Sequence, residues 1–553
     1  MKIKNIFAPS EQITFNDYML KCGVKDTNLY LSNQYVEPWQ NYDNIIEEAQ
    51  AINNAIKMKD NIYIVMDCDL DGLGTTLVQY IYLLKCDPTL HIKIFMHDKN
   101  PKAHGLADDE IMDKLIQEAS GIEGINSKEG LLWIGDAGSN NTEECKILSD
   151  LGYTCCISDH HDMTKPNPYA IVVNNQISPK VTNKSLSGCG VTFKVCQAID
   201  YINGTNYSRD LISLVHLTNI SDSCKFVHPE QQTFRYWGLQ MIYPTLQPFI
   251  DAFNYKGGLD NKSFSFGVVS RFNAVIRVGT LEQKQALFLA LALDRNIDEA
   301  IDICKKCKTE QDKTRDEIIE SGLTLQYNGK INIYETNVVT SLTGLIANKL
   351  QDRDNRTVFV VHNFDGEVKG SCRSPYDEED VNIRQLCEQS NEFNYASGHS
   401  SAFGVSWNYL DSQEVFSWIW SLTLSEPNIA ILGSWTTKSM PKYLFSEFGG
   451  NTSLYGQGMK DPLIHIHSIT VNQGDIREMG ANGRTLKLSK DGIDFMWFMI
   501  SNEDKKKLLN TPYELELVGT MGINEWNGRK TPQILVEKYE LKDLKKKTFD
   551  DIF

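Results

Sequence analysis

The sequence predicts an α/β protein: a parallel sheet comes first, a long helix leads to a smaller α/β lobe, and a small β-barrel ends the chain. In the first half, short apolar runs alternate with helix-like stretches, and a second alternation begins near residue 329. Continuous apolar strands that alternate with helices are typical of parallel sheets covered on both faces. After residue 428 the pattern changes to short, spaced β-runs, which are typical of a small barrel of the OB kind.

Each predicted element has a definite place in the sequence. The strands predicted for the first sheet are residues 62–66, 92–96, 131–134, 154–158 and 170–173. The helices predicted beside them are residues 44–57, 75–84, 107–118, 142–151 and 211–220. A helix over 281–293 and a long polar helix over 296–319 follow, and they predict a connection between two lobes.

The second lobe and the barrel are predicted from shorter signals. In the lobe, strands at 331–334 and 357–362 flank a helix at 342–350, and residues 368–374 and 396–401 are expected to form polar loops suited to phosphate. The β-runs of the barrel are residues 463–471, 485–488, 513–518 and 533–536. We therefore expect four parts, namely an N-terminal segment with the first sheet over 1–250, a helical connector over 251–328, the second lobe over 329–427 and the barrel over 428–553.

The composition limits the classes of function. Hydrophobic residues make up 41% of the 553 residues and charged residues 23%, as in ordinary globular proteins. The net charge of −17 argues against bulk electrostatic capture of nucleic acid or of an anionic membrane, although a locally basic channel can still bind a strand. No apolar run of about 18 residues predicts a membrane span, and residues 1–8 lack the apolar core of a signal peptide. With 13 scattered cysteines and no disulfide pattern, we expect a cytoplasmic protein with reduced thiols.

Acidic side chains and histidines follow three of the predicted strands and one helix. They are Asp67, Asp69 and Asp71 after the first strand, Asp136 after the third, Asp159, His160 and His161 after the fourth, and Asp222 after the helix at 211–220. Ligands of doubly wound sheets collect outside the carboxyl ends of the strands, so we expect the groups that follow the three strands to share one site. Crowded carboxylates resist joint ionisation unless a cation lies among them. Aspartates with imidazole suit Mn²⁺ or Mg²⁺, and two such ions about 4 Å apart would activate a water for displacement at phosphorus.

Simpler interpretations exist for each motif taken alone. The run from Asp67 to Gly72 starts like an EF-hand loop, but Val78 stands at the twelfth position, where that loop requires a glutamate. A single acidic turn can be solvated surface, and two adjacent histidines are more often surface or packing residues than ligands. Cys304 and Cys307 have no second cysteine pair at zinc-finger spacing, so we expect them to be part of an ordinary helix. The coincidence of several strand ends is what favours a metal site.

The ordered motifs resemble the DHH phosphoesterases and, among them, the RecJ-type single-strand exonucleases. Residues 66–72, 135–136, 159–161 and 222 are similar to the four DHH motifs, with Cys68 where an aromatic residue is common. Residues 186–194 and 270–277 resemble two RecJ segments, and residues 370–374 and 398–404 resemble the two signatures of the DHH-associated domain. Ser397 and Phe403 replace a usual glycine and a usual alanine there. Residues 524–529 and 532–534 resemble the last hairpin of the RecJ OB domain, so the resemblance covers most of residues 60–541.

The resemblance implies a role for each motif residue. Asp69 and Asp71 would each face one of two metal ions, and Asp136 would bridge the ions. His160 and Asp222 would complete the ligand set, with Asp67 as a further ligand or a neighbour of one. Asp159 would orient a histidine, and His161 would contact the scissile phosphate. The implied substrate-binding residues are His161, Arg271, Arg277, Ser371, Arg373, Gly398, His399 and Trp526.

The implied function is a metal-dependent single-stranded DNA exonuclease that hydrolyses phosphodiester bonds from the 5′ end, with two Mn²⁺ or Mg²⁺ ions, in DNA repair or recombination. We expect a monomer whose partners are single-stranded DNA and, in the cell, a helicase or a single-strand-binding protein. Two alternatives stay open. One is a DHH phosphoesterase that acts on short oligonucleotides or cyclic dinucleotides, and the connecting helix and the barrel argue against it. The other is a RecJ-like DNA-binding replication factor without catalysis, and the intact ligand set argues against it.

Overall fold

The computed structural model describes residues 2–8, 12–97, 104–120, 130–253, 259–337, 341–376, 381–480, 483–498, 500–510, 512–526 and 528–543. The chain divides into two compact units. The larger unit is Asn28–Ser425, and the smaller unit joins Met1–Thr27 to Glu426–Phe553. Our predicted four-part division placed residues 1–27 with the first sheet, and the compact units differ from it there.

Five parallel strands form the first sheet of the larger unit, in the order β3-β2-β4-β5-β6. Their bounds are β2 (Ile62–Met66), β3 (Ile92–Met96), β4 (Leu131–Gly135), β5 (Thr154–Asp159) and β6 (Ile171–Asn174). Every residue of β2 and β4 is buried, as the continuous apolar runs predict for central parallel strands. All five predicted strands are present.

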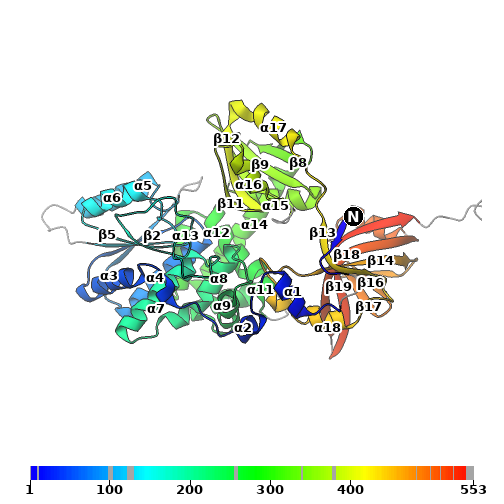
Figure 1. The fold of residues 1–553 in the computed structure, drawn as a ribbon, viewed down its shortest axis with the longest axis horizontal. Helices are drawn as coiled ribbons and strands as arrows, with labels where there is room; N and C mark the ends of the chain where they lie inside the picture. The colour runs from blue at the N-terminus through cyan, green and yellow to red at the C-terminus, as the bar shows by residue number, and fades with distance from the viewer. Residues whose placement is uncertain are drawn as a thin grey trace, which may run out of the picture. The chain divides into compact units, whose positions relative to one another are not determined.

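Helices cover both faces of this sheet (Figure 1). On one face, α5 (Asp109–Ser120) and α6 (Thr142–Asp150) pack in a core that includes Tyr63 and Val65. On the other face, a larger core that includes Ile64 joins the sheet to α3 (Ile45–Met58), α4 (Leu70–Cys86), α7 (Gly188–Asn203) and α8 (Ile212–Ser221). Alternate side chains of β2 therefore enter two different cores.

Helix α4 begins five residues before its predicted start at Thr75. Asp69 caps the helix, because its side chain accepts the backbone N–H groups of Asp71 and Gly72. The cap puts Asp71 into the first turn of the helix.

A helical region connects this sheet to a second lobe. Its helices are α9 (Pro229–Gln240), α10 (Gln247–Phe253), α11 (Asn261–Phe264), α12 (Ser270–Val278), α13 (Leu281–Leu293) and α14 (Ile297–Ser321). A π-helical turn, Ser265–Val269, joins α11 to α12. The predicted long helix is α14, and Cys304 and Cys307 are buried within it.

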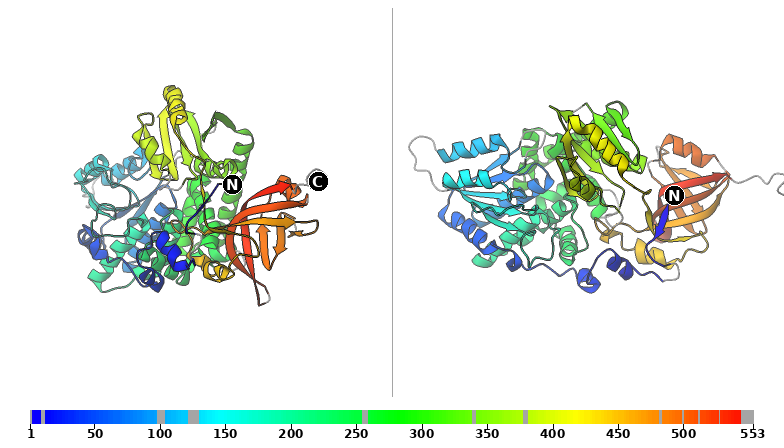
Figure 2. Two further views of the ribbon diagram at one scale, coloured as in Figure 1. Left: turned by 45° about the vertical axis from the view of Figure 1, so that its right-hand side comes forward. Right: turned by 45° about the horizontal axis from the view of Figure 1, so that its top comes forward.

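The second lobe contains a six-stranded sheet in the order β11-β12-β10-β9-β8-β7. Its strands are β7 (Leu323–Asn328), β8 (Ile331–Thr336), β9 (Thr357–Phe364), β10 (Glu367–Arg373), β11 (Tyr395–His399) and β12 (Ala402–Asn408). Helix α15 (Thr343–Asp354) packs with Val358 and Val360 on one face. Helices α16 (Ile383–Gln389) and α17 (Ser412–Ser421) share the other core with Phe359 and Val361, and Figure 2 shows α17 along that face.

The predicted polar loops at 368–374 and 396–401 are wrong in part, because most of these residues lie in the antiparallel strands β10 and β11. Val368, Cys372 and Ala396 are buried in the lobe core. The small polar residues and glycines around them hid the period of two that marks a half-buried strand.

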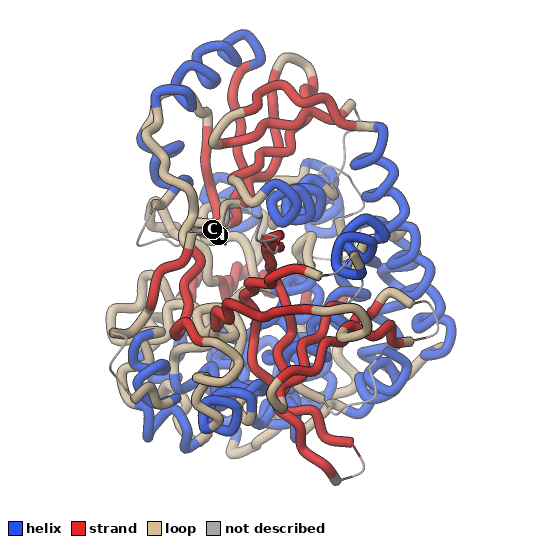
Figure 3. The backbone as a smooth tube through the Cα atoms, turned by 90° about the vertical axis from the view of Figure 1, so that its right-hand side faces the viewer, coloured by secondary structure: helices blue, strands red, loops and turns tan. Residues whose placement is uncertain are grey.

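The smaller unit contains an eight-stranded mixed sheet in the order β1-β13-β14-β18-β19-β17-β16-β15. Its strands are β1 (Ile3–Asn5), β13 (Ile429–Trp435), β14 (Leu463–Val471), β15 (Ile476–Met479), β16 (Thr485–Lys490), β17 (Ile493–Trp497), β18 (Tyr513–Trp526) and β19 (Arg529–Asp543). Strands β18 and β19 form the long hairpin predicted near the C-terminus (Figure 3). Helices α1 (Phe15–Lys21), α18 (Tyr443–Gly449) and α19 (Asn502–Leu509) complete the unit. None of the helices in the described ranges of the chain meets the length and hydropathy that a membrane crossing requires.

Candidate metal centre

The turn between β2 and α4 presents the first three carboxylates. Asp69 Oδ1 accepts the N–H groups of Asp71 at 2.9 Å and Gly72 at 3.1 Å. The Asp71 carboxylate accepts the N–H groups of Gly188 at 2.7 Å and Cys189 at 3.2 Å, at the start of α7. Two helix N-termini thus hold two of the aspartates, and such ends favour negative charge. Gly72 permits the close turn, since a Cβ there would lie 2.6 Å from the carbonyl oxygen of Asp67.

Asp136 follows β4 with a left-handed backbone, at a φ of 64°. Such a conformation is uncommon outside glycine and points to a local constraint. Its side chain is buried, and Oδ1 lies 3.1 Å from His160 Nε2, yet Oδ1 has no hydrogen bond from the described residues. A buried carboxylate oxygen without a hydrogen bond is energetically unfavourable, and a bound cation would supply the missing interaction.

Asp159 at the end of β5 organises both histidines. Its Oδ1 accepts the backbone N–H of His160 at 2.7 Å and that of His161 at 3.2 Å. The same oxygen lies 2.9 Å from His161 Nδ1, and Oδ2 accepts the N–H of Ser139. Desolvation opposes charge on both groups, but their mutual hydrogen bond and attraction lower the pKa of Asp159 and raise the pKa of His161 to about 10. His161 is therefore an imidazolium at neutral pH.

The predicted metal ligands converge in two groups at the carboxyl edge of the sheet, and a third group, formed by Asp136, His160 and His161, overlaps both. In each group one possible ligand atom from every residue lies within 4.8 Å of the others. The first group is Asp67, Asp69 and Asp136, and the second is Asp71, His160 and Asp222. His160 Nε2 lies 3.9 Å from Asp71 Oδ2, and Nδ1 lies 3.7 Å from Asp222 Oδ2. Asp136 links the two groups through its contact with His160.

The electrostatics of the centre favour added positive charge. Burial, followed by the charges of Asp71 and Asp69, raises the pKa of Asp136 well above its usual value. Burial also raises the pKa of Asp71 and brings that of Asp222 to about 6. Carboxylates that ionise with difficulty in the bare protein become fully charged when a divalent cation binds among them. The oxygen-rich set with imidazole fits Mn²⁺ or Mg²⁺.

Cationic side chains from the connector and the second lobe lie near this centre. The charge of Asp69 raises the pKa of Arg277, although desolvation lowers it on balance. Desolvation lowers the pKa of Arg373 in β10, and the charge of Arg277 lowers it further. The pKa of His399 is lowered by desolvation and then by His160, Lys225 and Arg373. Arg277 thus interacts with Asp69, His399 with His160, and Arg373 with Arg277 and His399, while the binding of phosphate by these residues stays a prediction.

Other predicted substrate-binding residues have different surroundings. Arg271 donates to the carbonyl oxygens of Phe266 and Gly267, lies over the ring of Phe253 and lines a separate pocket of about 760 Å³ between α12 and α14. The Oγ of Ser371 lies 2.9 Å from the Oγ1 of Thr343, and Ser371 belongs to the same strand, β10, as Arg373. Gly398 lies in β11, where it pairs with Phe403, and its φ of 129° favours glycine at this position. The side chain of Trp526 lies outside the described residues.

Sequence reasoning missed three residues at this edge. Lys225 follows Asp222 and interacts with His399. Cys68 and His104 form a further group with Asp67, in which the ligand atoms again lie within 4.8 Å of one another. The carboxyl-end rule, applied to β3 as it was to its neighbours, would have drawn attention to the segment that contains His104.

Two segments of the chain match known domain families. Residues 61–218 match the N-terminal domain of the DHH family, and residues 450–538 match the RecJ OB domain. Residues 61–218 are therefore similar to a DHH domain, and residues 450–538 to a RecJ OB domain. The predicted resemblance to RecJ-type proteins is thereby confirmed, and the OB prediction for the C-terminal strands is confirmed with it.

Relatives of this RecJ-like chain are similar at low identity over long spans. The SPbeta prophage-derived protein YorK of Bacillus subtilis, which bears the name of a single-strand DNA-specific exonuclease, is 26% identical over 96% of each chain. The single-stranded-DNA-specific exonuclease RecJ of Bacillus subtilis is 25% identical over 91% of this chain and 65% of its own length.

A solved structure shows that the fold is shared. The crystal structure of RecJ in complex with Mn²⁺ from Thermus thermophilus superimposes with a TM-score of 0.71, at 18% identity, over 90% of this chain and 72% of the other. The structure of the same RecJ in complex with Mg²⁺ gives a TM-score of 0.64 at 17% identity. The predicted α/β architecture with its C-terminal OB domain is therefore confirmed.

Proposed function

We propose that the chain is a metal-dependent single-stranded DNA exonuclease that releases nucleotides from the 5′ end by hydrolysis, with a role in DNA repair or recombination. The observation that carries the proposal is the pair of ligand groups joined at Asp136, with cationic side chains beside them. The names of the relatives support the choice of single-stranded DNA as substrate. The manganese and magnesium complexes of the Thermus protein support the choice of metal.

The proposed site holds two Mn²⁺ or Mg²⁺ ions, one in the group of Asp67, Asp69 and Asp136 and one in the group of Asp71, His160 and Asp222. Such ions would lower the pKa of a bound water and stabilise the attacking and leaving oxygens of an in-line displacement. Asp136 is the residue best placed to be shared, because its Oδ1 accepts no hydrogen bond from any residue that the structure describes and lies 3.1 Å from His160 Nε2.

The protein's own side chains would bind and orient the strand end. His161, held as a cation by Asp159, would contact a non-bridging phosphate oxygen. Arg373 would bind the same phosphate from the second lobe through its planar guanidinium, and Arg277 and His399 would add charge. The OB domain would follow the backbone of the strand, with aromatic side chains stacked on bases in a sequence-tolerant way.

The test compares the wild-type chain with Asp136→Ala on single-stranded DNA labelled at the 5′ end, first with Mn²⁺ and then with EDTA. A matched control is Asp210→Ala, which removes an exposed carboxylate that pairs with Lys85 at 2.7 Å, outside the ligand groups. We expect release of labelled mononucleotides by the wild type and the control with Mn²⁺, and none with EDTA or with Asp136→Ala. Equal degradation by Asp136→Ala would refute the assignment.

The same assay separates the alternatives. A 3′-labelled strand that loses its label first would reverse the proposed polarity. Cleavage of dinucleotides or cyclic dinucleotides without degradation of long strands would favour the short-substrate phosphoesterase. Binding of the strand by the wild type without degradation under any metal would favour the catalytically inactive DNA-binding factor.

A further inference from the structure

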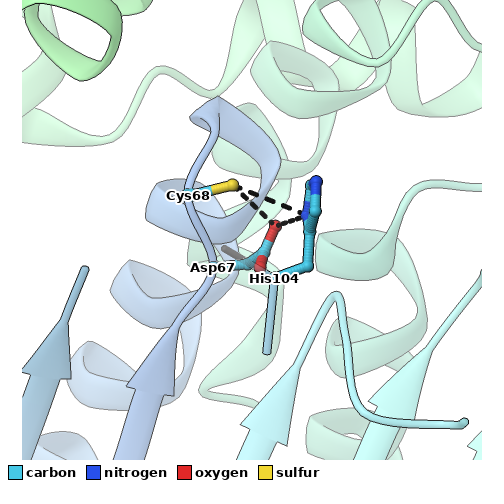
Figure 4. A group of neighbouring side chains, drawn as sticks. All are labelled: Asp67, Cys68 and His104. Atoms are coloured by element: carbon cyan, nitrogen blue, oxygen red, sulfur yellow. Dashed lines mark hydrogen bonds and ion pairs between the residues drawn. The ribbon is translucent and has the colours of Figure 1, made fainter. Parts of the chain in front are cut away.

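A second kind of ligand cluster lies beside the proposed metal pair, on Asp67, Cys68 and His104 (Figure 4). His104 Nδ1 lies 3.2 Å from Asp67 Oδ2 and 3.5 Å from Cys68 Sγ. Cys68 Sγ lies 3.7 Å from Asp67 Oδ2. Three donors of different chemistry, a carboxylate, a thiol and an imidazole, thus form a closed triangle.

The triangle is built from two segments of the chain and held by the backbone. Asp67 and Cys68 belong to the turn after β2, and His104 comes from the segment before α5, so the three side chains that Figure 4 labels come from two separate segments. Asp67 is only 2% exposed, and its Oδ1 accepts the N–H of Gly105 at 2.9 Å. That bond orients the carboxylate so that Oδ2 faces the thiol and the imidazole. The His104 side chain is 60% exposed, so the open side of the triangle faces solvent.

The side lengths of the triangle match those of a tetrahedral zinc site. Zinc binds sulfur at about 2.3 Å and imidazole nitrogen or carboxylate oxygen at about 2.0–2.1 Å. Tetrahedral angles then separate sulfur from nitrogen by about 3.5 Å, nitrogen from oxygen by about 3.3 Å and sulfur from oxygen by about 3.5 Å. The observed separations are 3.5, 3.2 and 3.7 Å. A small closure of the triangle would bring all three donors to one ion.

We propose that Asp67, Cys68 and His104 bind Zn²⁺, with the fourth position open to water. Thiolate and imidazole select zinc over Mg²⁺ and Mn²⁺, so this position is chemically distinct from the two proposed catalytic ions. Asp67 is common to this triad and to the group with Asp69 and Asp136. Zinc in the triad therefore withdraws Asp67 from the catalytic group and lowers exonuclease activity. This loss of activity rests on the proposed function, whereas the binding of zinc does not rest on it.

Cobalt substitution tests the binding without any assay of activity. Full-length, reduced, metal-free protein is titrated with Co²⁺, and a thiolate-to-cobalt charge-transfer band in the near ultraviolet reports sulfur ligation. We expect the band to reach its maximum at one equivalent of Co²⁺ and to disappear when Zn²⁺ is then added. Cys68→Ser should remove the band, and the matched variant Cys22→Ser, which changes another half-buried cysteine, should keep it. Absence of the band in the wild type, or its persistence in Cys68→Ser, would overturn the proposal and leave the contacts as hydrogen bonds.

Inhibition by zinc tests the regulatory consequence. With Mn²⁺ held constant, we expect the Zn²⁺ concentration for half-inhibition of DNA degradation to rise at least tenfold in His104→Ala. Without zinc, this variant should degrade DNA as the wild type does. Equal inhibition of both proteins would refute the sharing of Asp67. If the wild type degraded no DNA even without zinc, that result would contradict the proposed function. The cobalt band would still test the zinc site.

Discussion

The substitution Gly188→Ala tests the geometry of the proposed centre without removing any ligand. A Cβ at position 188 would lie 2.6 Å from the Cα, the Cβ and Oδ1 of Asp136, whereas ordinary contacts of this kind are 3.4–4 Å. The backbone N–H of Gly188 also donates to Asp71 at 2.7 Å, so the new methyl group would push on one ligand while its own N–H binds another. Relief of the contact requires a relative shift of nearly 1 Å at the residue that joins the two ligand groups.

Displacements on the order of 1 Å in a catalytic constellation cost about 100-fold in rate. Overpacking of a tight interior typically costs about 1–3 kcal/mol of stability, which a domain of this size tolerates. We therefore expect Gly188→Ala to lose about 100-fold in kcat/KM for single-stranded DNA and to need more Mn²⁺ for half-maximal activity. Circular dichroism and denaturant unfolding should show a folded protein of modestly reduced stability.

The matched control is Gly522→Ala, where an added Cβ would meet nothing within 4 Å. This control should retain activity and metal dependence, which separates the steric effect at Asp136 from the general loss of a glycine. If Gly188→Ala degraded DNA at the wild-type rate with the wild-type Mn²⁺ requirement, the close packing of α7 against Asp136 could not be the feature that positions the ligands.

Three further predictions concern charge. Burial raises the pKa of Glu48 to about 8, so the folded state holds a proton that the unfolded chain has lost, and stability falls as pH rises through this window. Between pH 5 and 7 the free energy of unfolding should fall by on the order of 2 kcal/mol in the wild type, and Glu48→Gln should remove this fall, as measured by urea unfolding. Asp159→Asn should move the alkaline decline of activity to lower pH, because the pKa of His161 is about 10 only beside that carboxylate; an unchanged pH profile would refute this. Arg373→Lys should raise KM about tenfold through loss of the two-pronged contact, with Arg384→Lys, at a half-buried arginine of α16 that pairs with Glu388, as the control.

Much of the first sheet could be predicted from the sequence because its strands are continuous apolar runs. Strand β2 is buried on both faces, so nothing in its pattern competes with the strand prediction. The carboxyl-end rule then brought Asp136 and His160 to one place without any knowledge of distances, and the resemblance to the DHH motifs added Asp222, which follows a helix. The observed ligand groups contain all of them. Their roles as catalytic residues stay predictions.

The features that sequence reasoning missed depend on contacts between distant or weakly patterned segments. Strand β1 has three residues, too few for any periodicity, and exists because it pairs with β13. Cys68 and His104 are 36 positions apart, and neither belongs to a motif that suggests the other. Strand β10 contains Gly370 and Ser371, which interrupt its apolar pattern. Its buried side chains pack in a core with helices that the strand pattern alone does not reveal.

The pairing of β1 with β13 has a consequence for the order in which the chain can fold. Ile3 pairs with Ile429, so β1 is synthesised before the larger unit, whereas the other strands of its sheet are synthesised after that unit. At about 5–20 residues per second, synthesis of the roughly 400 intervening residues takes on the order of 20–80 s. Throughout that interval the N-terminal strand has no partner, while the larger unit can fold during translation. A fusion at the N-terminus should therefore impair the assembly of the smaller unit and spare that of the larger one.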